Sequence, residues 1–269
     1  MPAARQVVTR SPKRNVGLIN CPWFQDRPIE HESRLEKHFV LRAMLFPGLK
    51  SIKHQPFSMT LLNHGKRYTP DFLLTFSNGE RLVFEIKRAE RIKQQKERLG
   101  EISQLCNEAG LRFFIVHQGQ IEGQRRAERA ALIRKYAMHD LAPALVQSVT
   151  EHVRQRKAGV SVQALKKKFG ISQEQVFAMV AHRHIATNKE LHLSDDDLLV
   201  STSSEINDAS IQFGSWFGCA PWFTAVGIHE LGGWQQGAVP GSKNPTSASN
   251  ETYDLLRGGN VQEDSTRHW

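Results

Sequence analysis

The chain has 269 residues, of which 39% are hydrophobic, and a formal net charge of +9. This length leaves room for two domains of ordinary size. No run approaches the roughly 18 apolar residues of a membrane span, and no apolar stretch follows the basic N-terminal residues, so we expect a soluble intracellular protein. The three cysteines, Cys21, Cys106 and Cys219, are too few and too scattered for a disulfide framework or a C-x-x-C metal site.

The charge is distributed unevenly along the chain. Residues 201–269 contain three basic and seven acidic residues and carry −4, whereas the first 200 residues carry +13. A basic body of this size favours a polyanionic partner, because neutralising phosphates releases counterions. Charge alone does not identify that partner, since many proteins are basic without binding nucleic acid.

The first half of the chain predicts an α/β unit. Residues 1–28 are polar and proline-punctuated, which is typical of an extended arm. Residues 30–46 have apolar positions at three- and four-residue steps and predict an amphipathic helix that ends at Pro47-Gly48. A strand is expected before the turn at 63–65, and the turn at 77–80 predicts that residues 72–76 and 82–86 pair as antiparallel strands.

The rest of this unit returns to helical periodicity. Residues 91–109 predict a helix that ends at Gly110, and residues 111–117 form a continuous apolar run typical of a strand buried on both faces. The order of elements predicts a restriction-endonuclease-like mixed sheet flanked by helices over residues 29–118.

The second half predicts a different organisation. Helical periodicity dominates from 119 to about 185, and two helices meet at Gly170-Ile171-Ser172, with Ser172 as an N-cap. A two-stranded wing is expected around Asn188-Lys189, so residues 119–204 predict a winged helix-turn-helix domain. Residues 205–269 are rich in Ser, Gly and Asn, show neither period, and predict a flexible acidic tail.

Aromatic side chains gather in that tail. They are Trp216, Phe217, Trp222, Phe223 and Trp234. One hypothesis is that they anchor a partner protein, because Trp and Phe bury a large area at low entropic cost. The alternative is that they dock on this chain's own surface.

Two carboxylates and a lysine are expected to converge on the predicted hairpin. Asp71 follows Pro70 at the start of one strand, and Glu85 and Lys87 lie on the next. Alternate residues of a strand share a face, so Glu85 and Lys87 point the same way while the side chain of Ile86 points into the core. The hairpin then brings Asp71 beside them.

This combination of groups suits phosphodiester hydrolysis. Paired carboxylates are costly together unless divalent cations neutralise them, and hard oxygen ligands bind Mg²⁺ or Mn²⁺. We expect two ions that polarise the phosphate and supply a nucleophilic water, with Lys87 orienting that water or stabilising charge on the phosphate. As a bare string the P-D, spacer, E-x-K pattern is only moderately specific, but its strand context strengthens it. The alternative is a structural hairpin with chance ion pairs.

The preceding helix offers two further carboxylates. Glu32 and Glu36 are four residues apart and share one helix face, so spacing does not choose between them. Among nearby histidines no metal-ligand spacing is evident, and Gln55 in the His54-Gln55-Pro56-Phe57 run is a minor candidate for contacting a water or phosphate near the site.

The runs SRLEKHFVLRAML, SIKHQPFSM, YTPDFLLTF and VFEIKRA together resemble the TnsA family, the endonuclease subunits of heteromeric Tn-seven-type transposases. The resemblance extends over about residues 20–200 and implies a PD-(D/E)xK fold. Its S-x-L-E context selects Glu36 over Glu32. It implies Glu36, Asp71, Glu85 and Lys87 as catalytic residues, and Glu36, Asp71, Glu85 and the main chain of Ile86 as metal ligands.

The resemblance also implies an activity and partners. The expected reaction is cleavage of the 5′, non-transferred strands of double-stranded DNA at transposon ends. The expected partners are a TnsB-like DDE transposase and a TnsC-like AAA+ regulator. Two alternatives stay open, namely a stand-alone restriction or repair nuclease with the same residues, and a non-catalytic DNA-binding or assembly module built on the winged helix.

Overall fold

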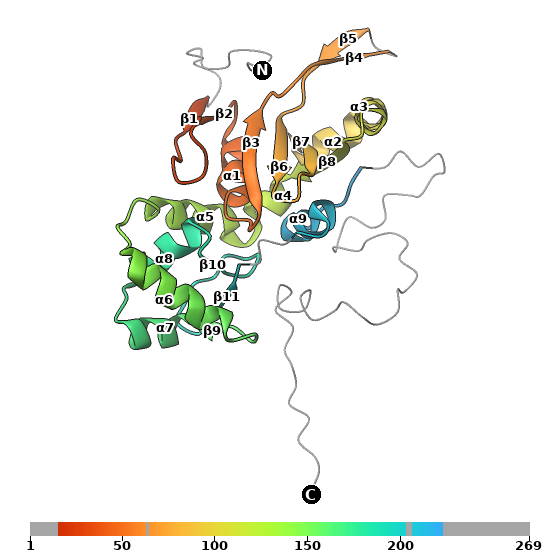
Figure 1. The fold of residues 1–269 in the computed structure, drawn as a ribbon. Helices are drawn as coiled ribbons and strands as arrows, with labels where there is room; N and C mark the ends of the chain where they lie inside the picture. The colour runs from red at the N-terminus through yellow and green to blue at the C-terminus, as the bar shows by residue number, and fades with distance from the viewer. Residues whose placement is uncertain (1–15, 63–64, 203–205, 223–269) are drawn as a thin grey trace, which may run out of the picture.

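The computed structural model describes residues 16–62, 65–202 and 206–222 (Figure 1). Its centre is a four-stranded mixed sheet in the order β3-β6-β7-β8. The strands are β3 (Leu49–His54), β6 (Phe72–Phe76), β7 (Arg81–Lys87) and β8 (Arg112–His117). β3 pairs with β6 and β6 with β7 in antiparallel fashion, whereas β8 runs parallel to β7. The predicted mixed sheet flanked by helices is therefore confirmed.

The predicted hairpin is present in the expected register. Phe72 faces Phe84 and Thr75 faces Arg81 across β6 and β7. The turn between the strands uses Gly79 at a φ of +86°, a conformation that glycine adopts without steric cost. The second strand is longer than expected and extends to Lys87, because β8 continues to pair with β7 up to that residue.

Helices and a second hairpin cover the two faces of this sheet. Val83, Phe113 and Ile115 face a core shared with α2 (Ala89–Gln94) and α3 (Lys96–Glu108). The hairpin of β4 (Met59–Leu61) and β5 (Lys66–Tyr68) joins the same core. Phe84 and Phe114 face the other way, toward the core that contains α1 (Arg34–Ala43). The single helix expected over 91–109 is two helices, because the backbone leaves helical geometry at Gln95.

The N-terminal region differs from its prediction. Helix α1 begins only after Ser33, whose side chain accepts a 3.1 Å hydrogen bond from the amide of Glu36. Just before it, β2 (Ile29–His31) pairs with β1 (Gly17–Ile19). Ile19 and Cys21 are buried, so the expected extended arm is wrong for this part of residues 16–28. Residues 1–15 lie outside the described residues.

Six helical segments lie between β8 and β10. They are α4 (Gln118–Glu122), the 3₁₀ helix η1 (Gly123–Arg125), α5 (Arg126–Lys135), α6 (Pro143–Arg154), α7 (Val162–Phe169) and α8 (Gln173–Ala181). Helix α5 packs on α1, and buried side chains from both halves of the chain form one continuous core. None of the helices among the described residues has both the length and the apolar character needed to cross a bilayer.

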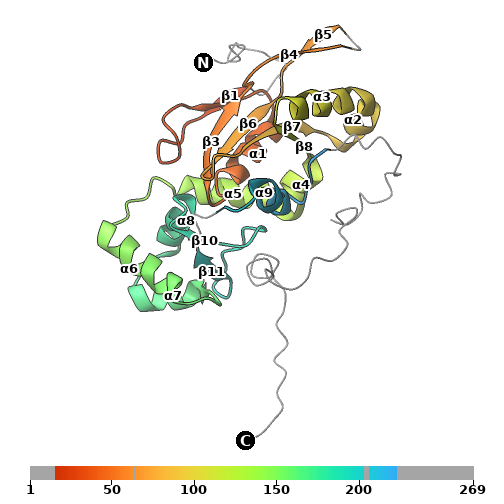
Figure 2. The same ribbon diagram turned by 45° about the vertical axis from the view of Figure 1, so that its right-hand side comes forward.

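A three-stranded sheet in the order β10-β11-β9 lies beside α6 and α7 (Figure 2). Its strands are β9 (Val160–Ser161), β10 (Ile185–Ala186) and β11 (Leu198–Ser201). The prediction of a two-stranded wing around Asn188-Lys189 is wrong in its second strand, because β10 pairs with β11 and not with the residues just after Lys189. Ile185 pairs with Ser201 and Ala186 with Val200, so a connection of eleven residues, 187–197, separates the two strands. Leucines 191 and 193 in this connection are buried, which explains why their alternation resembled a strand.

The tail prediction is wrong for residues 206–222. Helix α9 (Ala209–Phe217) starts at Asp208, which accepts a 3.1 Å hydrogen bond from the amide of Ile211. The ring of Phe213 is fully buried and lies 5.0 Å from that of Phe46 and 5.2 Å from that of Phe84. Burial of these rings fixes α9 on the four-stranded sheet. Trp216 and Phe217 on the same helix are buried as well, so the alternative that the aromatic residues dock on this chain's own surface is correct for these two. Phe223 and Trp234 lie outside the described residues.

Glycines in this segment serve packing. A β-carbon on Gly214 would lie 2.6 Å from the carbonyl oxygen of Cys219, whose amide donates a 2.8 Å hydrogen bond back to the carbonyl of Gly214. Gly218 ends the helix at a φ of +69°. The glycine content that suggested an irregular tail is therefore a requirement of a tightly packed helix end.

Candidate active site

Asp71, Glu85 and Lys87 meet at one end of the four-stranded sheet. The β6–β7 register places Asp71 next to Glu85, because the adjacent pair is Phe72 with Phe84. The ammonium of Lys87 donates a hydrogen bond to Oε1 of Glu85. The amide of Ile86 donates a 2.7 Å hydrogen bond to Oδ2 of Asp71. The main chain of Ile86 thus holds Asp71 in place, while its side chain is buried in the core as expected.

Glu36 approaches the same region from the first turn of α1. Its Oε2 accepts a 2.7 Å hydrogen bond from the amide of Glu32, and its Oε1 accepts one of 2.8 Å from the hydroxyl of Ser33. The ring of the buried His54 at the end of β3 places Nε2 3.6 Å from Oε2 of Glu36. These bonds hold the pKa of Glu36 below its usual range against the opposing effect of burial.

The charges of the four predicted residues act on one another. Burial raises the pKa of Asp71 well above its ordinary value, the carboxylates of Glu85 and Glu36 raise it further, and Lys87 opposes the shift. Burial lowers the pKa of Lys87, but the carboxylates of Glu85 and Asp71 outweigh burial and raise it overall. The site is therefore rich in negative charge, with one ammonium group to offset it.

Tyr68 is a site residue that sequence analysis missed. It ends β5, three residues before Asp71, and its buried hydroxyl donates a hydrogen bond to Oε2 of Glu85. Burial and the charges of Glu85 and Asp71 raise the pKa of this hydroxyl well above its usual range, so it stays protonated as a donor. The only signal in the sequence was that Tyr68 lies two residues before the Pro70-Asp71 pair. A single tyrosine at such a position does not by itself predict a role in the site.

Gln55 also borders the site. Its expected contact with a water or phosphate there stays a prediction. Its amide donates a 2.9 Å hydrogen bond to the carbonyl of Asp71, and its Nε2 donates one of 3.1 Å to Oε1 of Glu32. Its φ of +42° is unusual for a residue with a side chain. Its Oε1 is buried and has no hydrogen-bond partner among the described residues.

The carboxylates are close enough to influence one another but do not form a ready-made ligand cluster. Within residues 16–62, 65–202 and 206–222, no group of three or more His, Cys, Asp or Glu side chains is arranged to hold a metal ion. Each carboxylate instead has protein partners: Glu36 has Ser33 and His54, Asp71 has the amide of Ile86, and Glu85 has Tyr68 and Lys87.

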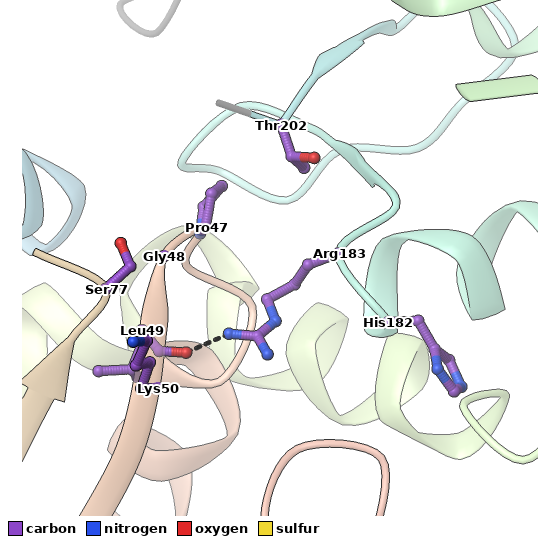
Figure 3. A pocket seen from close by; sticks show the side chains of 8 residues that line it. All are labelled: Pro47, Gly48, Leu49, Lys50, Ser77, His182, Arg183 and Thr202. Carbon is purple, nitrogen blue, oxygen red and sulfur yellow. Dashed lines mark hydrogen bonds between the residues drawn. The ribbon is translucent and has the colours of Figure 1, made fainter. Parts of the chain in front are cut away.

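A separate cavity lies at the opposite end of the sheet. It measures about 260 Å³ and is lined where β3 begins and β6 ends, by residues from 47–50, Ser77, His182, Arg183 and Thr202 (Figure 3). The guanidinium of Arg183 donates a hydrogen bond to the carbonyl of Leu49. None of the four predicted site residues lines this cavity, so it is distinct from the candidate active site.

Comparison with known proteins matches one segment of the chain to a family. Residues 47–118 match the family described as TnsA-like endonuclease N terminal. The matched segment contains Asp71, Glu85 and Lys87 and ends with β8, but begins after α1 and so leaves out Glu36. No curated protein matches the chain.

Proposed function

From the TnsA-like endonuclease N-terminal segment at residues 47–118, we propose that this chain is a PD-(D/E)xK DNA endonuclease that cleaves the 5′, non-transferred strands at transposon ends. The observation that carries the proposal is the meeting of Asp71, Glu85 and Lys87 at one sheet end inside that segment. The charge of Glu36, from outside the segment, acts on the same carboxyl group of Asp71.

The donor set fits Mg²⁺ or Mn²⁺. Asp71, Glu85 and Glu36 supply hard carboxylate oxygens, with the main chain of Ile86 as the further proposed ligand. Burial, and then the charges of Glu85 and Glu36, raise the pKa of Asp71, and a divalent cation would offset both effects. The buried, unpartnered Oε1 of Gln55 offers one more oxygen at the edge of the site. When bound, one or two such cations supply the polarisation of the phosphate and the activation of the attacking water.

The protein groups around these oxygens have separate tasks. The amide of Ile86 fixes the orientation of Asp71, and the hydroxyl of Tyr68 fixes Glu85. Lys87 stays charged next to Glu85 and is placed to orient a water or to stabilise negative charge on the phosphate, since an ammonium is a donor and not a metal ligand. This division of roles matches hydrolysis of a phosphodiester.

We further propose that residues 143–201 form a winged helix-turn-helix. The order α6, β9, α7, α8, β10, β11 with the sheet order β10-β11-β9 supports it. The hydroxyl of Ser172 caps α8 by accepting a hydrogen bond from the amide of Gln175, and the amide of Ser172 in turn donates a 2.9 Å hydrogen bond to Oε1 of Gln175, which fixes the turn between the two helices. Resemblance to TnsA suggests that this unit contacts DNA and the AAA+ regulator.

The activity is tested first without partners. The intact chain is incubated with supercoiled plasmid in Mg²⁺, in Mn²⁺ or in EDTA, beside Asp71→Ala. Nicking that requires the cation and Asp71 supports the nuclease. Full cleavage by Asp71→Ala contradicts the site assignment.

The transposition role needs a second assay. The chain is combined with a TnsB-like DDE transposase, a TnsC-like AAA+ regulator and a DNA that carries a transposon end. Breaks mapped to the 5′ ends of the non-transferred strands support the proposal. Cleavage at a fixed recognition sequence without those partners favours a stand-alone restriction nuclease instead.

A further inference from the structure

We propose that the β4–β5 hairpin is a DNA-binding arm of the active site, with Lys66 and Arg67 on phosphates and Leu62 against base edges. The proposal rests on the proposed nuclease function, because that function makes duplex DNA the partner. The chain enters this hairpin after β3 ends at His54 and leaves it for β6 just after Asp71. The hairpin therefore emerges from the sheet end that carries the catalytic groups.

The hairpin extends beyond the four-stranded sheet. Its two strands form a separate sheet in the register Thr60 with Arg67 and Leu61 with Lys66 (Figure 1). Figure 2 shows the same projection from a second direction, above α3. A two-stranded ribbon of this kind fits the major groove of DNA. The shape of the element thus suits the proposed partner.

The two faces of the hairpin differ in character. Leu61 and Tyr68 are buried and pack toward α2 and α3, which anchors the hairpin on the body. Thr60 and Arg67 form the opposite, exposed face, and Lys66 is exposed near the tip. Leu62 is 81% exposed, the highest value among the exposed large hydrophobic residues of the described chain. Lys66, which pairs with Leu61, and Arg67, which pairs with Thr60, point to opposite faces of the ribbon, so the two cations suit the phosphates on the two sides of a groove.

The charge around the hairpin favours a polyanion over a protein surface of mixed charge. No ion pair between described residues involves Lys66 or Arg67. The adjoining stretch from residue 88 to 97 exposes four cations against two carboxylates: Arg88, Arg91, Lys93 and Lys96 against Glu90 and Glu97. The excess of positive charge is therefore shared by the arm and the helices beside it.

The arm is joined to the catalytic carboxylates through its own last residue. Tyr68 ends β5 and donates to Glu85, while the guanidinium of Arg98 on α3 lies 5.5 Å from the centre of its ring. Lys66 and Arg67 directly precede Tyr68 in the sequence, so DNA that they bind would lie close to the carboxylate of Glu85. The same contact gives the arm a fixed position at its base.

Duplex binding by the full chain tests the arm. Fluorescence anisotropy with a short DNA duplex is measured in EDTA over a range of salt concentrations, so that no cleavage is needed. Lys66→Ser with Arg67→Ser should weaken binding about tenfold at 0.1 M salt and lower the log–log salt slope by about 2, since each phosphate contact contributes about 0.9. The matched control, Lys50→Ser with Lys135→Ser, removes two exposed charges away from the hairpin and should change affinity less than about threefold.

Leu62→Ser should weaken binding about fivefold and leave the salt slope unchanged, because it removes an apolar contact only. Met138→Ser, which removes a similarly exposed apolar side chain far along the chain, is its control. Thermal melts verify folding, and Lys66→Gln with Arg67→Gln replaces the serine pair if that variant unfolds. Equal affinities for the hairpin variants and their controls, or no duplex binding by the parent, overturn the arm.

The two proposals fail in different ways. A parent chain that nicks DNA while hairpin variants bind normally refutes the arm and keeps the nuclease. A parent that binds through the hairpin but cleaves nothing in Mg²⁺ or Mn²⁺ refutes the nuclease and keeps the arm.

Discussion

Tyr68 donates its hydroxyl hydrogen to Oε2 of Glu85, while Lys87 occupies Oε1 of the same carboxylate. Both oxygens of Glu85 are therefore held by side chains at one end of the sheet, and Glu85 is only 3% exposed. A carboxylate fixed in this way is already oriented before a cation or substrate arrives. This preorganisation is typical of groups that hold metal ligands in place.

Removing the hydroxyl of Tyr68 should therefore impair the site without dismantling it. We expect Tyr68→Phe to reduce nicking activity roughly 10- to 100-fold, the usual cost of losing a group that orients a metal ligand. The activity should recover partly at higher Mn²⁺ concentration, because the defect lies in cation affinity. Titration of Mn²⁺ in the nicking assay measures this shift.

The control for Tyr68 is Tyr136→Phe. Tyr136 follows α5, and its ring stacks on that of Phe177 at 5.4 Å, away from the catalytic end of the sheet. Its variant should show an unchanged requirement for Mn²⁺. A Tyr68→Phe enzyme with the same requirement as the parent would leave Tyr68 a purely structural residue.

The buried carboxylate of Asp71 should lower the free energy of unfolding of the protein when no cation is bound. Burial and the charges of Glu85 and Glu36 disfavour its carboxylate, so Asp71→Asn should raise the free energy of unfolding in EDTA by about 1 kcal/mol. Mn²⁺ should then raise the melting temperature of the parent but not of the variant, which should also be inactive. A variant less stable than the parent in EDTA would show that the ionised carboxylate stabilises the fold.

Glu36, in the first turn of α1, and Glu32, which precedes that helix, should differ in importance. Glu36 acts on the charge of Asp71, whereas Glu32 accepts a hydrogen bond from Gln55. We expect Glu36→Gln to reduce nicking roughly 100-fold and Glu32→Gln to change it less than about threefold. Single-turnover rates of both variants provide the comparison. Equal losses would mean that the wrong glutamate has been assigned.

The β6–β7 hairpin was predictable because its signals are local. Alternating apolar residues, the Asn78-Gly79 turn and the two-residue step from Glu85 to Lys87 determine the strands, their register and the shared face. Placing Glu36 near Asp71 needed the family resemblance, because α1 and β6 are joined only by tertiary packing. The four predicted residues do influence one another, but their role in catalysis stays a prediction.

What sequence reasoning missed depends on contacts between distant segments. Arg42 is 1% exposed, and its guanidinium bonds the carbonyls of Gln120 and Trp216, which lie 78 and 174 residues away. The ring of Phe217 lies 4.4 Å from this guanidinium. No pattern around Trp216 signals such a partner, because the glycines that permit the packing also resemble those of a loop. The long connection before β11 was missed because the alternation of the buried Leu191 and Leu193 resembled a strand.

The boundary of the tail gives the sharpest test of how the C-terminal segment is used. A chain ending at residue 205 lacks α9, and loses the buried rings of Phe213 and Phe217 together with the carbonyl of Trp216 that Arg42 bonds. Loss of even one buried phenylalanine costs about 3–5 kcal/mol, and an uncompensated buried guanidinium adds to it. We expect this chain to be unfolded or insoluble, as judged by circular dichroism.

A chain ending at residue 222 keeps α9, the amide of Trp222 bonded at 2.7 Å to the carbonyl of Phe113, and the hydroxyl of Ser103 bonded to the carbonyl of Trp222. It should melt at the temperature of the full chain and nick DNA at the same rate without partners. The hypothesis that Phe223 and Trp234 anchor a partner then predicts that the shortened chain retains a TnsC-like AAA+ regulator more weakly in a pull-down than the full chain does. Phe213→Ala in the full chain is the control, since it should lower the melting temperature without removing residues 223–269. If the chain ending at 222 unfolds as well, residues beyond it belong to the core, and if it retains the regulator fully, those aromatic residues serve another purpose.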